Sequence, residues 1–277
     1  GYWPDGGMTP ACDEAMIIDI KEMKKLGFNM LRKHIKIEPR RWYYHCDKLG
    51  MIVWQDMVCG AKKIDMLLVG VLPNMFIRGI KDDKYKWFGV DNTECREEHE
   101  KAVFETIDLL YNFTSIGCWV PFNEAWGQFD AKRIGEAVKK HDPTRVVDHA
   151  SGWHDQKGPE LKSVHQYILP FIAPKGDGRP LVLSEFGGYS RIIENHVWNR
   201  QKSFGYVMYK TKETLTAAYK KLFEKQIIPS IAKGLSATVY TQVSDVEFEV
   251  NGIFTYDREL LKIDGDTIRE INSKLTY

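Results

Sequence analysis

Several features that would assign a chain to a class at once are missing from these 277 residues. The longest apolar run, residues 66–72, ends at Pro73 and is far shorter than the roughly 20 residues that a membrane helix needs. Neither sign of charge dominates, because 39 Lys and Arg face 38 Asp and Glu and leave a formal charge of +1. We therefore expect neither nucleic acid nor a membrane as a partner.

Cysteine motifs and phosphate-binding turns are missing as well. The five cysteines form no CxxC pair and are odd in number, which argues against a disulfide scaffold or a zinc ribbon and predicts buried, reduced thiols. Reduced thiols favour the cytoplasm, although export from a bacterium stays open. The glycines of residues 176–178 lead into a strand rather than a helix, so they form no dinucleotide fingerprint.

What the sequence does contain is a recurring order of amphipathic helix, glycine and apolar strand. Residues 13–26 are apolar at every third or fourth position, with Asp13 as the expected cap, and residues 28–34 follow as a strand. The same order returns at residues 38–56 and 222–242. The other predicted elements are helices at residues 94–110 and 130–140 and strands at residues 116–122, 145–149, 163–167 and 181–184.

Strands that alternate with helices predict a parallel sheet with right-handed crossovers. Seven strands suit a doubly wound sheet, whereas a (β/α)8 barrel needs eight. Polar side chains at the carboxyl ends of the strands favour the barrel, which builds its active site there. These are Arg32, His34, Gln55, Asp56, Asn123, Glu124, Asp148, His149, His165, Tyr167, Glu185, Gln242 and Asp245. We expect an α/β fold, a (β/α)8 TIM barrel in one domain over residues 1–277, with its first strand supplied from upstream of Gly1.

The strongest local signal for chemistry is residues 118–127, where apolar residues and a proline lead into Asn123-Glu124, with Trp126 close behind. A carboxylate beside apolar rings loses hydration, which raises its pKa and suits a general acid. Alternatively, Glu124 caps the next helix or pairs with Lys132 or Arg133.

A second carboxylate, Glu185, ends the apolar strand at residues 181–184 and is followed by two glycines. Taken alone, it could equally form a buried ion pair with Arg32. Two carboxylates at the mouth of one barrel fit the retaining mechanism of glycoside hydrolysis, in which one protonates the leaving oxygen and the other attacks the anomeric carbon.

The ordered motifs resemble family 2 of the glycoside hydrolases, the group of β-galactosidases, β-mannosidases and β-glucuronidases. The matching segments are residues 31–34, 42–50, 53–56, 118–127, 184–187 and 251–258. The resemblance covers essentially the whole chain and implies a carbohydrate substrate, with no cofactor and no metal among the matched residues. In that family a jelly-roll and an immunoglobulin-like domain precede the barrel, so we expect upstream β-sandwich domains of the same polypeptide as partners. A homo-oligomer is a further expectation.

The resemblance also implies roles for individual residues. Glu124 is the acid/base, Glu185 the nucleophile, and Asn123 hydrogen-bonds the 2-hydroxyl of the sugar. Tyr240 stands where many members carry a tryptophan. The candidate substrate-binding residues are Asn123, Arg32, His34, Asp56, Trp126, His149, Tyr167 and Tyr240.

The choice of sugar rests on weaker signals. The Asn-x-Lys pair by which glucuronidases bind a carboxylate would fall near residues 249–251, where there is no lysine. Residues 53–56 resemble the mannosidase version of their strand, and residues 32–34 the galactosidase and glucuronidase version. We expect a retaining, β-galactosidase-like enzyme, because that is the commonest activity in the family. β-Mannosidase or β-glucuronidase specificity and a catalytically silent carbohydrate-binding barrel remain the alternatives.

Overall fold

A computed structural model describes residues 2–72 and 79–276 of the chain. The chain divides into two compact units. Unit 1 consists of Gly1–Asn29, Gln166–Gly176 and Glu185–Tyr277, and unit 2 of Met30–His165 and Asp177–Ser184. The expectation of a single domain over residues 1–277 stays a prediction.

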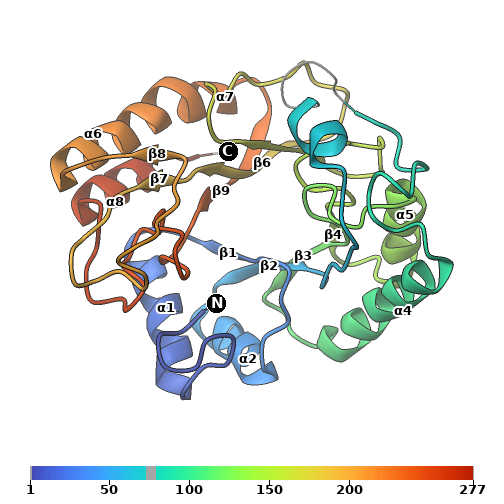
Figure 1. The fold of residues 1–277 in the computed structure, drawn as a ribbon, viewed down its shortest axis with the longest axis horizontal. Helices are drawn as coiled ribbons and strands as arrows, with labels where there is room; N and C mark the ends of the chain where they lie inside the picture. The colour runs from blue at the N-terminus through green and yellow to red at the C-terminus, as the bar shows by residue number, and fades with distance from the viewer. Residues whose placement is uncertain (1, 73–78, 277) are drawn as a thin grey trace. The chain divides into compact units, whose positions relative to one another are not determined.

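Unit 2 is built around a four-stranded parallel sheet of order β1-β2-β3-β4 (Figure 1). The strands are β1 (Met30–Lys33), β2 (Ile52–Asp56), β3 (Ile116–Val120) and β4 (Val146–Val147). The order of the strands in space is their order along the chain, as in a barrel. A doubly wound sheet would show a reversal of that order. Because the strands are parallel, the residues at their carboxyl ends meet at one edge of the sheet.

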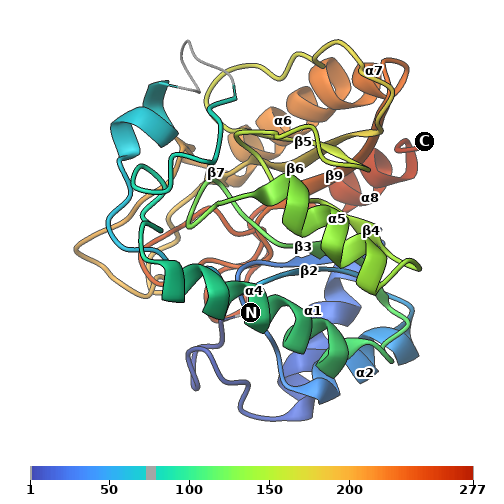
Figure 2. The ribbon, with the colours of Figure 1, turned by 90° about the vertical axis from the view of Figure 1, so that its right-hand side faces the viewer.

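Helices α2 (Arg40–Leu49), α4 (Thr93–Leu110) and α5 (Ala131–His141) connect these strands, and a short π-helix, η1 (Met66–Val71), lies between β2 and α4. The buried residues of α5 recur at helical spacing, with Ile134 and Val138 facing the core. Helix α5 contacts both β4 and α4 (Figures 1 and 2). The helices thus bury the outer face of the sheet and leave its carboxyl edge to polar side chains.

Unit 1 contains α1 (Asp13–Lys25), α6 (Lys212–Leu222), η2 (Phe223–Ile227), α7 (Ile228–Ile231) and α8 (Gly265–Ser273). Its strands are β7 (Tyr189–Ser190), β8 (Val207–Met208) and β9 (Leu235–Thr241). A sheet of order β5-β6-β9 includes β5 (Lys162–Gln166) and β6 (Leu181–Gly187). Every residue of β6 is buried, and the strand passes from unit 2 at Ser184 into unit 1 at Glu185.

All seven predicted strands are present, but some helix boundaries differ from the prediction. Asp13 is the first residue of α1, and Cys12 holds the cap position without a side-chain hydrogen bond. The helix predicted from residue 222 begins at Lys212, after a capping box formed by Thr211 and Thr214. A π-helical turn precedes Pro229, whose missing N–H and ring disfavour a regular helix.

The five cysteines are all free thiols, as expected. The prediction that they are buried is correct for Cys46 and Cys118 and wrong for Cys12 and Cys95, which are exposed. Within residues 2–72 and 79–276, every helix is too short or too polar to span a lipid bilayer.

Candidate active site

Arg32 is the central cation of unit 2. Its Nε and Nη2 atoms donate to the two carboxylate oxygens of Asp56, both at 2.9 Å, and its Nη1 atom donates to the backbone oxygen of Ser184 at 2.9 Å. The side chains of Arg32 and Asp56 are only 2% and 1% exposed. A planar guanidinium that is held on several sides has a fixed orientation, so Arg32 presents its remaining N–H groups in defined directions.

One of these N–H groups orients Asn123. Nη2 of Arg32 donates to Oδ1 of Asn123 at 2.7 Å, so the amide nitrogen of Asn123 faces the opposite way, 3.2 Å from Nε2 of His34. Since an arginine can only donate, the orientation of the amide is determined. The structure thereby brings together Arg32, His34, Asp56 and Asn123, four of the residues singled out in the sequence.

Glu124 follows Asn123 in an unusual backbone conformation. Its φ is +46° and that of Ala125 is +64°, so two non-glycine residues occupy the left-handed region. The turn is held by hydrogen bonds from Glu124 N to Ser151 O and from Trp126 N to Asn123 O, both at 2.9 Å. Strained backbone of this kind concentrates at functional sites.

The Glu124 side chain is 19% exposed, and its Oε1 lies 2.8 Å from Nδ1 of His165. Burial raises the pKa of Glu124, against the opposing attraction of His34 and Arg32. A carboxyl in this state suits a general acid, as expected. The alternative roles are taken by other residues, since Asp130 occupies the cap position of α5 and Arg133 pairs with Glu100.

In unit 1, Glu185 lies beside two hydroxyl groups. The Tyr167 hydroxyl donates to Oε2 of Glu185 and lies 3.1 Å from Oγ1 of Thr241. The ring of Tyr167 is stacked on that of Tyr206, with centroids 4.1 Å apart and planes 6° apart. Gly188 leaves room for this stack, because a Cβ there would lie 2.5 Å from Cδ2 of Tyr206.

Three of the predicted substrate-binding residues differ in their exposure to solvent. Trp126 is 46% exposed, as a side chain that meets a ligand can be. His149 is only 1% exposed, and its Nε2 accepts from Gly158 N at 3.0 Å. Tyr240 is 8% exposed and packs in an aromatic core, with Phe186, Tyr219 and Phe223. His149 and Tyr240 are thus buried, and Thr241 rather than Tyr240 lies beside Tyr167. A contact of His149 or Tyr240 with the substrate stays a prediction.

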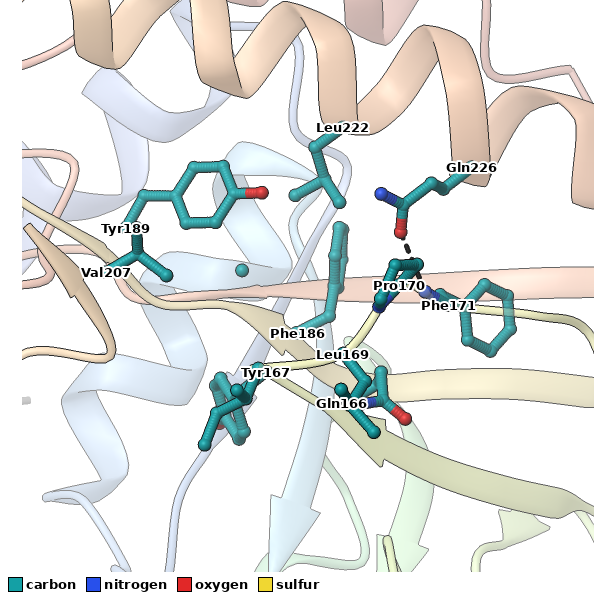
Figure 3. A pocket seen from close by; sticks show the side chains of 12 residues that line it. Gln166, Tyr167, Leu169, Pro170, Phe171, Phe186, Tyr189, Val207, Leu222 and Gln226 are labelled. Carbon is teal, nitrogen blue, oxygen red and sulfur yellow. Dashed lines mark hydrogen bonds between the residues drawn. The ribbon is translucent and has the colours of Figure 1, made fainter.

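A pocket of about 180 Å³ lies in unit 1, and Tyr167, the hydrogen-bond partner of Glu185, is among the residues that line it (Figure 3). Phe186, Leu222 and Gln226 line it, and Gln226 accepts a 2.7 Å hydrogen bond from Phe171 N. Side chains alternate along a strand, so Phe186 points away from the face of β6 that carries Glu185. The pocket therefore adjoins the Tyr167 ring, while Glu185 is not among its lining residues.

One group in unit 1 has the composition of a metal site. Single ligand atoms of His196, Asp257 and Glu259 lie within 4.8 Å of one another. His196 is already paired with Asp257 at 2.8 Å, and Glu259 is exposed.

Sequence reasoning listed His165 at the end of its strand without assigning it a role, assigned none to Ser151, and missed Thr241 and Tyr206. A role for His165 could have been found, because Ser163, His165 and Tyr167 alternate along β5 and so share one face of the strand. Tyr206 lies outside the strands of the β5-β6-β9 sheet, and no local pattern marks it.

Comparison with known proteins places the chain in a family. Residues 10–172 match the family described as "Glycosyl hydrolases family 2, TIM barrel domain". A β-galactosidase of Leuconostoc mesenteroides is 24% identical in an alignment 217 residues long, which covers 70% of this chain and 18% of that protein. The match therefore covers less than a fifth of the length of that relative.

Solved structures show the same fold. A GH2 β-galacturonidase from Eisenbergiella tayi superposes with a TM-score of 0.70 at 18% identity, over 99% of this chain and 50% of that one. A β-D-glucuronidase of Dictyoglomus thermophilum superposes with a TM-score of 0.66 at 17% identity, over 96% of this chain and 48% of that one. The prediction of a TIM-barrel fold is confirmed.

Proposed function

Because this chain belongs to family 2 of the glycosyl hydrolases, as its motifs predicted, we propose that it is the catalytic domain of a retaining β-glycosidase. The observation that carries the proposal is Glu124, a buried carboxyl with a raised pKa in a strained turn, directly after an asparagine that Arg32 orients. A fold alone does not specify a reaction, so the proposal rests on these groups.

In the first half of the reaction, Glu124 donates its proton to the glycosidic oxygen while Glu185 attacks the anomeric carbon. The hydrogen bond from Tyr167 to Glu185 orients the carboxylate that attacks. The bond from carbon to the aglycone oxygen breaks, that oxygen receives the proton, and a glycosyl ester of Glu185 forms.

In the second half, the ionised Glu124 removes a proton from water, and the hydroxide attacks the same carbon. Two inversions give a product of retained configuration, and Glu124 regains its proton. The amide nitrogen of Asn123 is a donor whose position Arg32 fixes, which suits a contact with the 2-hydroxyl of the sugar.

For the sugar, we propose a neutral β-glycoside of the galactoside type, with a β-mannoside as the alternative. Two solved structures with the same fold are a galacturonidase and a glucuronidase, which act on sugars that carry a carboxylate. In this chain the Asn251 amide donates a 2.8 Å hydrogen bond to the carboxylate of Glu249. The N–H group that would bind a substrate carboxylate is therefore already hydrogen-bonded to a negatively charged side chain. This disfavours a uronic acid in the position that residues 249–251 would contact.

The test is the intact mass of the chain after incubation with 2-deoxy-2-fluoro β-galactoside, β-mannoside, β-glucoside and β-glucuronide, each with a good leaving group. We expect one adduct, from the galactoside, and peptide mapping should place it on Glu185. The Glu185→Gln variant should take up no label, whereas replacement of the exposed Glu194 by Gln should leave labelling unchanged.

Two other outcomes would change the conclusion. An adduct on another carboxylate would remove Glu185 from the role of nucleophile. No adduct from any sugar, together with saturable binding of the same sugars by calorimetry, would establish the alternative of a silent carbohydrate-binding barrel.

A further inference from the structure

A row of hydrogen bonds leads from Glu124 into the interior of unit 2. His165 is its first member and has polar contacts at both ring nitrogens, with Nδ1 2.8 Å from Oε1 of Glu124 and Nε2 3.1 Å from Oγ of Ser151. Gly152 leaves space for the imidazole, because a Cβ there would lie 2.5 Å from its Cγ and Nδ1 atoms. An imidazole in this position can accept at one nitrogen while it donates at the other.

Three serine hydroxyls continue the row to a second carboxyl group. Ser151 Oγ lies 3.0 Å from Ser184 Oγ, the hydroxyls of Ser184 and Ser163 are hydrogen-bonded to each other, and Ser163 Oγ lies 2.9 Å from Oδ2 of Asp148. In the structure Ser151 donates to Ser184, and either hydroxyl can donate between Ser184 and Ser163. Because a hydroxyl both donates and accepts, reorientation of the hydroxyl groups reverses these links. The row therefore joins Glu124 to Asp148 without a break.

The far end of the row is closed to water. Asp148 and Ser184 are fully buried, and Ser151 is 1% exposed. Burial raises the pKa of Asp148, which the attraction of Arg32 and His149 opposes. Its Oδ1 has no hydrogen-bond partner among the described residues, so the ionised form is poorly solvated and a proton is readily held there.

The row admits two arrangements of the same protons. In the first, Glu124 is protonated and donates to Nδ1 of His165, the three hydroxyls donate toward Asp148, and Asp148 is ionised. In the second, Asp148 is protonated, each hydroxyl donates the other way, and Nδ1 of His165 donates to an ionised Glu124. One proton shift along each hydrogen bond converts one into the other, and the number of protons and the total charge are unchanged.

We propose that this row is a proton relay through which Glu124 and Asp148 share one proton. The proposal rests on the proposed role of Glu124 as the acid/base and deepens it, because it names what sets the protonation of that residue. His165, Ser151, Ser163, Ser184 and Asp148 are then positioning residues, since they act through Glu124.

The charges around the row decide between the two arrangements. Nη1 of Arg32 lies 3.3 Å from Nε2 of His165 and can only donate, which favours a lone pair on that nitrogen and hence the proton on Asp148. Asp56 neutralises part of the charge of Arg32, and the titratable groups that face the two carboxyls include His34 at Glu124 and His149 and Cys118 at Asp148. A bound glycosidic oxygen beside Glu124 shifts the balance, because it offers an acceptor for the proton on that side.

The relay would keep a proton available for general-acid catalysis at neutral pH. An isolated carboxyl with a moderately raised pKa is mostly ionised there, and only its protonated fraction can assist departure of the aglycone. A proton held on Asp148 is not exposed to solvent, yet it can reach Glu124 through the row.

The test is a pH titration of the chain labelled with ¹³C at the Asp and Glu carboxyl carbons, followed by NMR. The signal of Glu124 is assigned by its loss in Glu124→Gln, and that of Asp148 by its loss in Asp148→Asn. Two groups that share a proton titrate as a pair, so we expect both signals to change in the same two pH steps. An Asp148 signal that stays constant while Glu124 titrates would overturn the proposal.

Ser163→Ala tests the row itself, since it retains both carboxyls and removes the hydrogen bond that Ser163 donates to Asp148. We expect Asp148 to stay protonated and Glu124 to titrate in one step, about one pH unit below the upper step of the wild type. Ser230→Ala, a control at another buried serine, should keep both steps. Paired titration in Ser163→Ala, or its loss in Ser230→Ala, would contradict a relay through Ser163.

The kinetic counterpart uses aryl glycosides with poor and good leaving groups. In Ser163→Ala the alkaline limb of kcat/KM should move to lower pH for the poor leaving group, and rates with a dinitrophenyl glycoside should stay within about twofold, since that group leaves without an acid. An equal loss for both substrates would indicate a merely structural role. The NMR titration needs no turnover, so an inactive chain would count against the proposed function and leave the relay to be decided by NMR.

Discussion

Asp56 receives two parallel hydrogen bonds from Arg32, Nε to Oδ1 and Nη2 to Oδ2, each 2.9 Å long. This fork fixes the guanidinium plane, and the same Nη2 atom also fixes the amide of Asn123. A buried carboxylate thus orients a residue that is proposed to contact the sugar, although Asp56 itself is 1% exposed. The direct contact of Asp56 with the substrate stays a prediction.

Replacement of Arg32 by Lys should therefore reduce both stability and activity. A lysine keeps the charge, but it cannot donate hydrogen bonds to Asp56, Asn123 and the backbone oxygen of Ser184 at the same time. We expect the free energy of unfolding in urea to fall by about 1–3 kcal/mol, since buried acceptors lose their donors. Arg133→Lys is the matched control: Arg133 forms a similar fork with Glu100, but it is 53% exposed and should matter by less than about 1 kcal/mol. Equal losses in the two variants would contradict this interpretation.

Replacement of Glu124 by Ala should separate the two halves of the reaction. With a dinitrophenyl glycoside the first step needs no acid and should stay fast, whereas hydrolysis of the glycosyl-enzyme should slow by about 10²–10⁴-fold because the base is gone. Azide, a small anion that needs no base, should restore turnover and give a β-glycosyl azide. An α-glycosyl azide would show that the mechanism is not a double displacement.

Tyr206 should affect turnover through Tyr167. Tyr167→Phe removes the hydrogen bond to Glu185, and we expect kcat to fall by roughly 10–100-fold with little change in KM. Tyr206→Leu removes the stacked ring and should lower kcat in the same way, whereas Tyr206→Phe, which keeps the ring, should not. The double variant Tyr167→Phe/Tyr206→Leu should be no slower than Tyr167→Phe, and additive losses in this cycle would show that Tyr206 acts independently.

His99 should make stability depend on pH. Its ring is stacked on Phe122, and burial lowers its pKa to about 4. Unfolded histidine titrates near 6.5, so between about pH 6.5 and 4 the unfolded chain binds more protons, and stability falls as the pH falls through this range. The contribution is at most about 3 kcal/mol. His99→Phe should flatten this part of the curve in urea unfolding at several pH values, and an unchanged slope would show that His99 is not responsible.

The sequence predicted the strands and the carboxylate positions well, for a physical reason. Parallel strands buried on both faces are short apolar runs, and polar residues stand out where such runs end, as Glu124 and Glu185 do. Because both faces of such a strand are buried, its apolar sequence does not show on which face a given side chain lies. Tyr240 and its neighbour Thr241 point to opposite faces of β9. Residues 235–239 alternate between apolar and polar, but Tyr240 and Thr241 do not continue this pattern, so it did not tell them apart.

Contacts between residues far apart in the sequence could not be predicted from the sequence, for a different reason. The serines that connect His165 with Asp148 come from three separate segments of unit 2, and each is unremarkable in its own segment. Their alignment is a product of strand register, which a single sequence does not fix. The same holds for the stacking of Tyr206 on Tyr167.

The left-handed backbone at Glu124 has an implication for how this position evolves. A side chain with a Cβ and a positive φ is disfavoured, and glycine or asparagine would relieve about 1 kcal/mol of strain there. Stability alone would thus drive glutamate out of position 124, and only selection for activity retains it. A lineage that abandoned catalysis should lose this residue early and become more heat-resistant as it did so.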